Sequence, residues 1–159
     1  MVQCMTGSPA AFIANLDVDA LNQQLETATP QAILRWALHT YPRGLAQTNS
    51  FSIPVTLHML YEELCPPTPV PVIFLDTLHH FPETLATVDR AHQRYDLDLH
   101  VYCPTGADSR EAFANRYGAE LWHRDIERFH YLTKVEPLQR ALEDIEVTAW
   151  ITGRRRDQS

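Results

Sequence analysis

Residues 70–75 constrain the fold of this chain most strongly, because they form a nearly unbroken apolar run, Val-Pro-Val-Ile-Phe-Leu. Such a run is typical of a strand that helices cover on both faces. Apolar patterns and turn residues predict further strands at 45–48, 97–102 and 147–152, and helices at 17–27, 30–39, 54–64, 82–95, 108–117 and 133–145. Strands and helices therefore alternate, which predicts an α/β fold with a parallel sheet and helices on both faces.

The length of 159 residues fits a single domain over 1–159 that buries a core of its own. Residues 1–30 are expected to form a lead-in with one helix, ahead of the main folded region. Two helix starts are predicted from capping boxes, in which a capping side chain precedes a glutamate by three residues. These pairs are Asp108 with Glu111 and Thr133 with Glu136.

The formal net charge of −7 argues against a nucleic acid or a membrane surface as a partner, because both select a basic face. No apolar run approaches the roughly 20 residues that span a bilayer, and no signal peptide is evident. Three widely spaced cysteines, Cys4, Cys65 and Cys103, suit a reducing compartment better than a disulfide scaffold. A cytoplasmic protein is therefore expected.

Polar residues follow the predicted strands at the points where the strands end, and ligands of parallel α/β sheets bind at that edge. Thr48, Asn49 and Ser50 precede a helix, so their hydroxyl, amide and backbone N–H groups are suited to hold a phosphate. The alternative is that Asn49 or Ser50 caps that helix. Asp76 and Thr77 follow the second strand, where a carboxylate accepts hydrogen bonds from a ribose or an adenine amino group, or else caps the next segment.

The adjacent His79 and His80 do not form a convincing metal site, because neighbours on an extended segment point in opposite directions. No metal is therefore expected. Contact of one imidazole with a phosphate or sulfate is favoured over metal binding, and a plain loop role is the main alternative. Lys134 lies at the front of a predicted helix, where a cation opposes the helix dipole, and this slightly favours a ligand role.

The last predicted strand runs into Gly153 and three consecutive arginines, Arg154, Arg155 and Arg156. Glycine permits a ligand to approach the backbone closely, and arginine makes bidentate contacts with phosphate and sulfate. A basic cluster in an acidic protein favours an anionic ligand. On composition alone, a solvated basic segment has equal weight.

Four blocks of the chain, in order, resemble the phosphoadenosine phosphosulfate reductase family. Residues 46–52 (Ala-Gln-Thr-Asn-Ser-Phe-Ser) resemble its modified pyrophosphate loop, although Ser52 stands where the family commonly has glycine. Residues 74–84 resemble its Asp-Thr…Phe-Pro-Glu-Thr block, in a form close to the fungal one. Residues 133–141 (Thr-Lys-Val-Glu-Pro-Leu-Gln-Arg-Ala) and the basic block at 152–159 complete the series. The resemblance covers roughly residues 32–159.

The resemblance implies a nucleotide-binding domain with the fold of the adenine nucleotide alpha-hydrolases (PP-loop-like) and 3′-phosphoadenylyl sulfate as substrate. In the family, a cysteine thiolate attacks the sulfur and displaces adenosine 3′,5′-bisphosphate, and thioredoxin or glutaredoxin then releases sulfite for sulfate assimilation. The implied substrate-binding residues are Gln47, Thr48, Asn49, Ser50, Ser52, Asp76, Thr77, His79, Lys134, Gly153, Arg154, Arg155 and Arg156.

The positions of the cysteines indicate which branch of the family the chain resembles. A sister branch uses adenylyl sulfate and an iron–sulfur cluster, with paired cysteines just before the Lys-Val-Glu-Pro-Leu block. Residues 129–133 contain no cysteine, and four thiolates exceed the three cysteines present, so no cluster is expected. The family nucleophile lies in a Glu-Cys-Gly segment beyond the arginine block, which none of the three cysteines matches. The chain is therefore expected to be a truncated reductase that binds the nucleotide and lacks the catalytic thiol.

Two other functions stay open. An ATP pyrophosphatase of the same fold typically carries Ser-Gly-Gly-x-Asp-Ser in its loop, and residues 46–52 lack both glycines and the aspartate. A non-catalytic adenine-nucleotide-binding module is the other alternative. A missing C-terminal part would expose apolar surface or a sheet edge, so self-association, for example as a homodimer, is expected.

Overall fold

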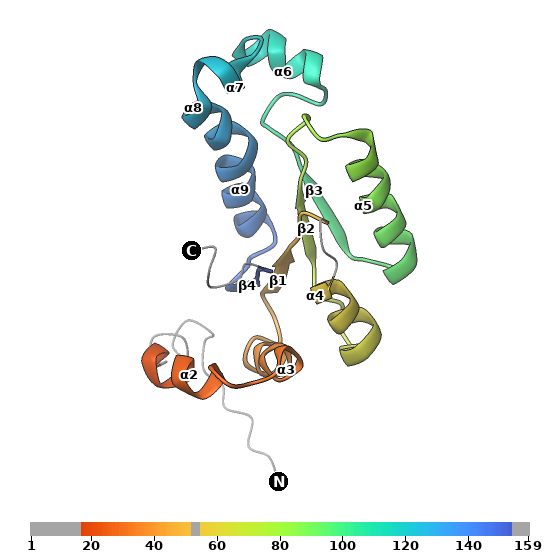
Figure 1. Cartoon of the computed structure of the whole chain (residues 1–159), viewed down its shortest axis with the longest axis vertical. Coiled ribbons are helices and arrows are strands. Elements are labelled where there is room, and N and C mark those ends of the chain that lie inside the picture. Colours follow the sequence, from red (N-terminus) through yellow and green to blue (C-terminus); the bar gives the residue numbers. More distant parts are fainter. Residues whose placement is uncertain (1–16, 52–54, 154–159) are drawn as a thin grey trace. The chain divides into compact units, whose positions relative to one another are not determined.

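A computed structural model of the chain describes residues 17–51 and 55–153 (Figure 1). The chain divides into two compact units, Met1–Arg43 and Gly44–Ser159. The sequence predicts one domain with a lead-in that ends near residue 30. The division after Arg43 differs from that expectation, because it assigns both predicted N-terminal helices to the first unit.

Within its described residues, 17–43, the first unit contains the helices α2 (Val18–Leu25) and α3 (Pro30–Thr40). The Asp17 side chain caps α2 by accepting a hydrogen bond from the Ala20 N–H at 3.0 Å. The Thr29 hydroxyl caps α3 by accepting one from the Ala32 N–H at 3.2 Å, and proline occupies the first turn. These capping contacts explain why both helices begin where the sequence predicts.

The second unit is built on a parallel sheet with strand order β3-β2-β1-β4. The strands are β1 (Leu45–Thr48), β2 (Val72–Leu75), β3 (Leu99–Tyr102) and β4 (Ala149–Ile151). Thr48 pairs with Ile73, and Leu75 pairs with Tyr102, so the strand ends lie along one edge. The predicted parallel α/β fold is confirmed, with three of the four strands slightly shorter than expected.

The helices of the second unit cover both faces of this sheet. They are α4 (Val55–His58), the π-helix η1 (Met59–Leu64), α5 (Pro82–Tyr95), α6 (Arg110–Tyr117), α7 (Leu121–Arg124), α8 (Ile126–His130), the π-helix η2 (Tyr131–Val135) and α9 (Glu136–Asp144). Helices α4 and α5 lie on one side of the strands and α9 on the other (Figure 1). Across residues 17–51 and 55–153, no helix is both long and apolar enough to cross a membrane.

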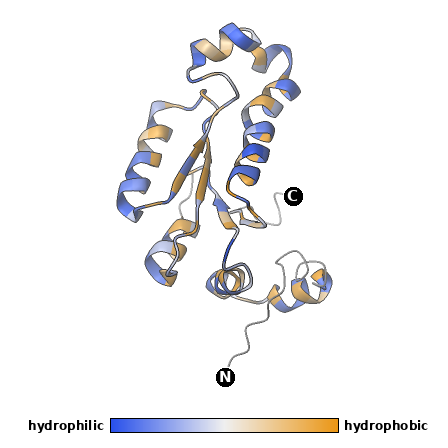
Figure 2. Cartoon of the chain, turned by 180° about the vertical axis from the view of Figure 1, so that it is seen from behind, coloured by the Kyte–Doolittle hydropathy of each residue, from blue (hydrophilic) through white to orange (hydrophobic). Residues whose placement is uncertain are grey.

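Alternate residues of β2 face two separate hydrophobic clusters. Val72 and Phe74 pack with Leu57 of α4 and with Val88 of α5. On the opposite face, Ile73 packs with Ala46 of β1 and Ala141 of α9, and Leu75 packs against this cluster. Figure 2 shows the strands as largely hydrophobic, whereas α5 and α9 carry bands of both kinds. The apolar run at 70–75 is therefore explained by burial on both faces of the sheet.

Both predicted capping boxes are wrong. Helix α6 is capped by Ser109, whose hydroxyl accepts a hydrogen bond from the Ala112 N–H at 3.1 Å, and not by Asp108. Thr133 does not begin a helix, because residues 126–144 form one helical run of α8, η2 and α9. Its buried hydroxyl instead donates a hydrogen bond to the Phe129 carbonyl oxygen at 2.8 Å.

Candidate functional site

The loops that follow β1 and β2 share one construction. The Asn49 Oδ1 atom accepts a hydrogen bond from the Phe51 N–H at 2.6 Å, and Phe51 has a φ of 58°. The Asp76 Oδ1 atom accepts one from the Leu78 N–H at 2.8 Å, and Leu78 has a φ of 62°. Each side chain therefore closes a tight turn in its own loop. Asp76 does cap the segment that follows it, which was one of its two expected roles.

Hydrogen bonds join the ends of neighbouring strands. The Thr48 hydroxyl donates to the Ile151 carbonyl oxygen at 3.5 Å, and the Asn49 N–H donates to the Ile73 carbonyl oxygen at 3.1 Å. The Asp76 N–H donates to the Tyr102 carbonyl oxygen at 2.9 Å. Thr48 pairs with Ile73, so Asp76 lies roughly 10 Å further along the strand direction. The edge is therefore stepped, with the β1 and β4 ends on the lower step.

Gln47 is fully buried and turned toward α4. Its Nε2 atom donates a short hydrogen bond to the Thr56 hydroxyl, and its buried Oε1 atom has no partner among the described residues. An amide in this position ties β1 to α4. This geometry gives Gln47 a supporting role, and its expected contact with a ligand stays a prediction.

Gly153 follows β4 and is exposed. A Cβ atom built on it would meet no described atom within 4 Å, and its φ does not lie in the left-handed region. Neither packing nor backbone conformation therefore requires glycine at this position, which leaves room for a ligand against the backbone. The predicted contacts of Ser52 and of Arg154, Arg155 and Arg156 fall on positions outside the described residues.

His79 and His80 have different surroundings. The His80 Nε2–H group donates to the Leu75 carbonyl oxygen at 3.1 Å, and its ring stacks on Phe74. The His79 Nδ1–H group donates to the Thr77 carbonyl oxygen at 2.7 Å, while its buried Nε2 atom has no partner among the described residues. The Nδ1 atom of His79 is therefore engaged by protein and its Nε2 atom is enclosed, and the expected contact of His79 with phosphate or sulfate stays a prediction. Within the described chain, no group of three His, Cys, Asp or Glu side chains is arranged around a metal site.

Lys134 is exposed on η2, in the middle of the helical run rather than at its start. The argument that its charge opposes a helix dipole is therefore wrong, because no helix begins there. Its neighbour Thr133 is fully buried. A contact between Lys134 and a ligand remains a prediction that rests on the family resemblance alone.

A cluster around Arg140 fastens the end of β3 to α9, and sequence reasoning missed it. The Arg140 guanidinium donates to Glu136 at 2.9 Å and to the Cys103 carbonyl oxygen at 2.6 Å, and it lies over the Tyr102 ring. Thr105 donates to the same Glu136 carboxylate at 2.9 Å. The spacing of Glu136 and Arg140, four residues apart on a helix, was the available signal.

Cys103 is the cysteine that lies at this edge of the sheet, directly after β3. Burial and then the nearby Asp76 carboxylate raise the pKa of its thiol, and Arg140 offsets this only in part. Because the thiolate is the nucleophilic form, this environment disfavours nucleophilic attack by Cys103. Cys65 is exposed at the end of η1, away from the strand ends in sequence and in the fold.

Comparisons with known proteins agree with this architecture. The phosphoadenosine phosphosulfate reductase domain matches residues 49–159. The phosphoadenosine phosphosulfate reductase of Emericella nidulans is 46% identical over 142 residues, which are 87% of this chain and 46% of that protein. The enzyme of Saccharomyces cerevisiae is 40% identical over 92% of this chain and 59% of its own length. A crystal structure of phosphoadenylyl-sulfate reductase from Candida auris, in a phosphate complex, superposes with a TM-score of 0.80 at 42% identity, over 89% of this chain and 68% of that chain.

The chain spans about half the length of the curated fungal relatives that it matches. The matched domain covers most of the second unit, including the residues that follow all four strands. The likeness therefore extends over the whole edge of the sheet that was expected to bind a ligand. The chain belongs to the phosphoadenosine phosphosulfate reductase domain family.

Proposed function

We propose that this chain supplies the nucleotide site of a thiol-dependent reductase that converts 3′-phosphoadenylyl sulfate to sulfite and adenosine 3′,5′-bisphosphate. The observation that carries the proposal is the stepped edge of the parallel sheet, where three family blocks meet at the ends of β1, β2 and β4. Ligands of parallel α/β sheets bind at this edge. The phosphate complex of the Candida auris relative supports anion binding by this domain.

The lower step of the edge suits the anionic part of the substrate. The turn at 48–51 and Gly153 offer hydroxyl and backbone N–H groups. The bond from Thr48 to Ile151 fixes this turn to the end of β4, and the bond from the Phe51 N–H to Asn49 closes the turn itself. Lys134 and the arginines at 154–156 supply the counter-charge. Asp76 and Thr77, on the upper step, lie near the adenosine and accept hydrogen bonds from its ribose or amino group.

The redox step needs a cysteine thiolate that attacks the sulfur, breaks the bond from sulfur to the phosphate oxygen, and leaves an S-sulfocysteine. A dithiol such as thioredoxin or glutaredoxin then supplies two electrons and releases sulfite. The raised pKa of Cys103 makes it a poor candidate for the attacking thiolate. We therefore expect the nucleophile to come from the Glu-Cys-Gly segment of the family, with no iron–sulfur cluster, in cytoplasmic sulfate assimilation that feeds cysteine and methionine synthesis.

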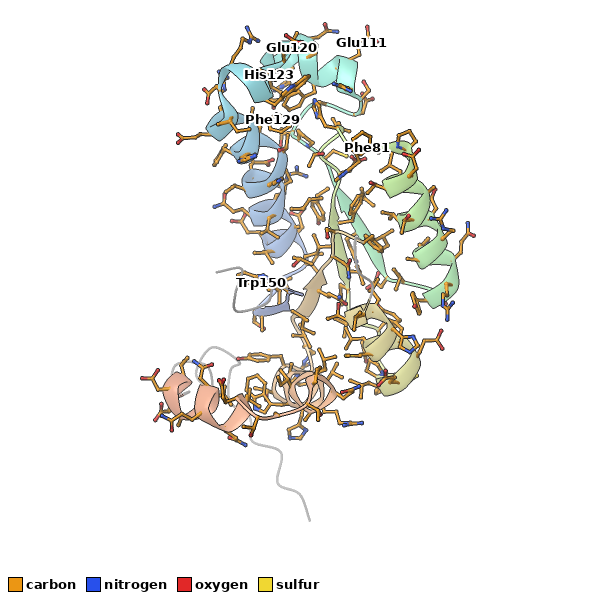
Figure 3. The ribbon with its side chains drawn as sticks, in the orientation of Figure 1. Phe81, Glu111, Glu120, His123, Phe129 and Trp150 are labelled. Atoms are coloured by element: carbon orange, nitrogen blue, oxygen red, sulfur yellow. The ribbon has the colours of Figure 1, made fainter. Side chains whose placement is uncertain are left out.

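Self-association is part of the proposal. Strands β3 and β4 are the outer strands of the described sheet, and Trp150 on β4 is 49% exposed (Figure 3). An unpaired strand edge with exposed apolar side chains favours association with a second chain. A mass measured by light scattering that rises with protein concentration is the expected result.

Calorimetry with adenosine 3′,5′-bisphosphate tests the nucleotide site. We expect saturable binding, and a ligand concentration of 100 times the Kd should stabilise the fold by about 2.7 kcal/mol. The absence of both heat and thermal shift would overturn the proposal. Release of pyrophosphate from ATP would favour an ATP pyrophosphatase instead, and sulfite formation by this chain with thioredoxin would show that one of its own cysteines is the nucleophile.

A further inference from the structure

Three aromatic rings converge on the imidazole of His79. Phe113 of α6, Trp122 of α7 and Phe129 of α8 lie with ring centroids 5.1, 5.2 and 5.1 Å from that of His79, and each approaches edge to face. Phe129 also contacts the other two rings, at 5.9 and 6.2 Å. Residues 110–130, here called the cap, therefore contribute one ring from each of their three helices to a single side chain outside them.

Hydrogen bonds fix the orientation of this imidazole. The Thr77 carbonyl oxygen can only accept, so the Nδ1 atom at 2.7 Å carries a proton, and the Nε2 atom lies on the other side of the ring. That Nε2 atom is buried and has no partner among the described residues. Phenylalanine would fill the same space without an unpaired nitrogen, so packing alone does not require histidine. What histidine adds here is the hydrogen bond to Thr77.

The bond to Thr77 reaches the loop that carries the upper step of the candidate site. Thr77 is buried, and its hydroxyl also accepts the His79 backbone N–H at 3.3 Å. The preceding residue, Asp76, holds the same loop through the Leu78 N–H. One side chain thus contacts the cap through its ring and the Asp76–Leu78 turn through its Nδ1 atom.

We propose that His79 is a positioning residue that fixes the cap to the Asp76–Thr77 turn and so holds these two residues in their nucleotide-binding geometry. The inference rests on the proposed function for the nucleotide, but the link between cap and turn does not depend on it. In this proposal His79 acts through the turn, because its Nδ1 atom is engaged by the Thr77 carbonyl oxygen and its ring is enclosed by the three aromatic side chains.

Two substitutions separate the ring from the hydrogen bond. His79→Phe keeps the ring contacts and loses the Nδ1 donor, whereas His79→Asn keeps a donor near the Nδ1 position and loses the ring. His123→Asn is the control, because it removes an exposed imidazole of the cap that contacts Trp122 at 5.8 Å but makes no contact with Thr77 or with the His79 ring. Hydrogen exchange of residues 76–80 and 110–130, measured without ligand, shows whether the turn and the cap stay protected. Calorimetry with adenosine 3′,5′-bisphosphate measures the affinity of the nucleotide site.

We expect His79→Phe to speed exchange at 76–80 while the cap stays protected. Binding should weaken by up to about tenfold, because the ligand must then order a turn that the Nδ1 hydrogen bond no longer holds, and one such bond contributes at most about 1.5 kcal/mol. His79→Asn should speed exchange throughout the cap, and His123→Asn should change neither measurement. If His79→Phe kept wild-type exchange rates at 76–80 and wild-type affinity, the proposal would be overturned. Wild-type exchange rates at 110–130 in His79→Asn would also overturn it. If the wild-type chain does not bind the bisphosphate, the proposed function fails and the exchange data alone decide the link.

A measurement on the wild-type chain covers the case in which a variant does not fold. Nitrogen-15 NMR of the histidine side chains should show a proton on the Nδ1 atom of His79. An Nδ1 atom without a proton could not donate to the Thr77 carbonyl oxygen, and that result would overturn the inference.

Discussion

At the scale of single residues, the two roles of Asp76 can be separated. Asp76→Asn keeps the Oδ1 acceptor that closes the turn at 2.8 Å from the Leu78 nitrogen, but it removes the charge. We expect little change in the free energy of unfolding and a loss of about tenfold in affinity for adenosine 3′,5′-bisphosphate, because hydrogen bonds to a charged acceptor are stronger than neutral ones. Calorimetry and urea unfolding measure the two effects. Asp89→Asn, at an exposed carboxylate of α5, makes the same change in net charge and should not weaken binding, because the ligand is an anion; an equal loss of affinity there would contradict a specific role for Asp76.

Gly153 offers a test of close approach by the ligand. Gly153→Ala should leave stability unchanged or raise it by about 0.5 kcal/mol, because its φ tolerates a side chain and the unfolded chain loses freedom. Its affinity for the bisphosphate should fall, since the new Cβ atom occupies the space beside the backbone. Gly44→Ala is the contrasting control: at a φ of +77° its Cβ would lie 2.7 Å from the Thr148 hydroxyl, so stability should fall. Full affinity in Gly153→Ala would contradict the placement of ligand there.

Glu136 gives a pH-dependent prediction. The hydrogen bond from Arg140 holds the pKa of the Glu136 carboxyl below its usual range. A lowered folded-state pKa means that the stabilisation is present above the unfolded pKa of about 4.3 and is lost as the pH falls through the lower folded value. Glu136→Gln should therefore cost about 0.5–1 kcal/mol at pH 7, the range for a partly exposed pair, and almost nothing in strong acid. Urea unfolding between pH 3 and pH 7 measures this, with exposed Glu143→Gln as control; a cost that does not change with pH would contradict it.

At the scale of elements, the start of α6 offers a test between two neighbouring residues, Asp108 and Ser109, as the N-terminal capping residue of this helix. Ser109→Ala removes the acceptor of the Ala112 N–H and should cost about 1 kcal/mol of stability. Asp108→Ala should cost much less, because the Asp108 side chain does not cap the helix. Urea unfolding of both variants measures the two losses of stability. Equal losses would mean that either residue can accept the hydrogen bond at the helix start. Sequence alone could not choose, since both residue types cap helices well.

The elements that sequence predicted best are those whose pattern reflects burial. The run at 70–75 is apolar because β2 packs on both faces, so the strand and its neighbours could be recognised. The helical run at 126–144 could not, because Pro137 is typical of a helix start. Inside a helix, proline removes a hydrogen bond and crowds the carbonyl of the residue four positions earlier, here Thr133. The π-helix η2 widens the helix immediately before that point, and nothing in the local sequence indicates it.

Only some residues of the candidate site could be placed from the sequence, and the reason is again the difference between topology and packing. Residues after strands are placed by topology, so the positions of Asn49, Asp76 and Gly153 followed from the strand pattern. The burial of Gln47 against Thr56 and the enclosure of His79 by rings from three helices depend on packing between distant segments. Polarity identifies such residues as candidates, but only tertiary contacts show whether their polar atoms face a ligand or the protein.

At the scale of the whole molecule, the two units differ in whether each is expected to fold as an isolated fragment. The second unit contains all four described strands and both hydrophobic clusters, and the family match at 49–159 lies within it. The helices α2 and α3 have 8 and 11 residues, which is shorter than an isolated helix needs for stability in water.

We therefore expect residues 44–159 alone to unfold in one cooperative transition, to keep the circular dichroism of an α/β fold, and to bind adenosine 3′,5′-bisphosphate as the whole chain does. In a fragment of residues 1–43, the helices α2 and α3 should be largely unfolded, because they are too short to persist without packing. Thermal unfolding and calorimetry of the two fragments beside the whole chain measure this. If residues 44–159 lost their cooperative transition, the sheet would depend on the first unit, and the division after Arg43 would not mark an independent folding unit.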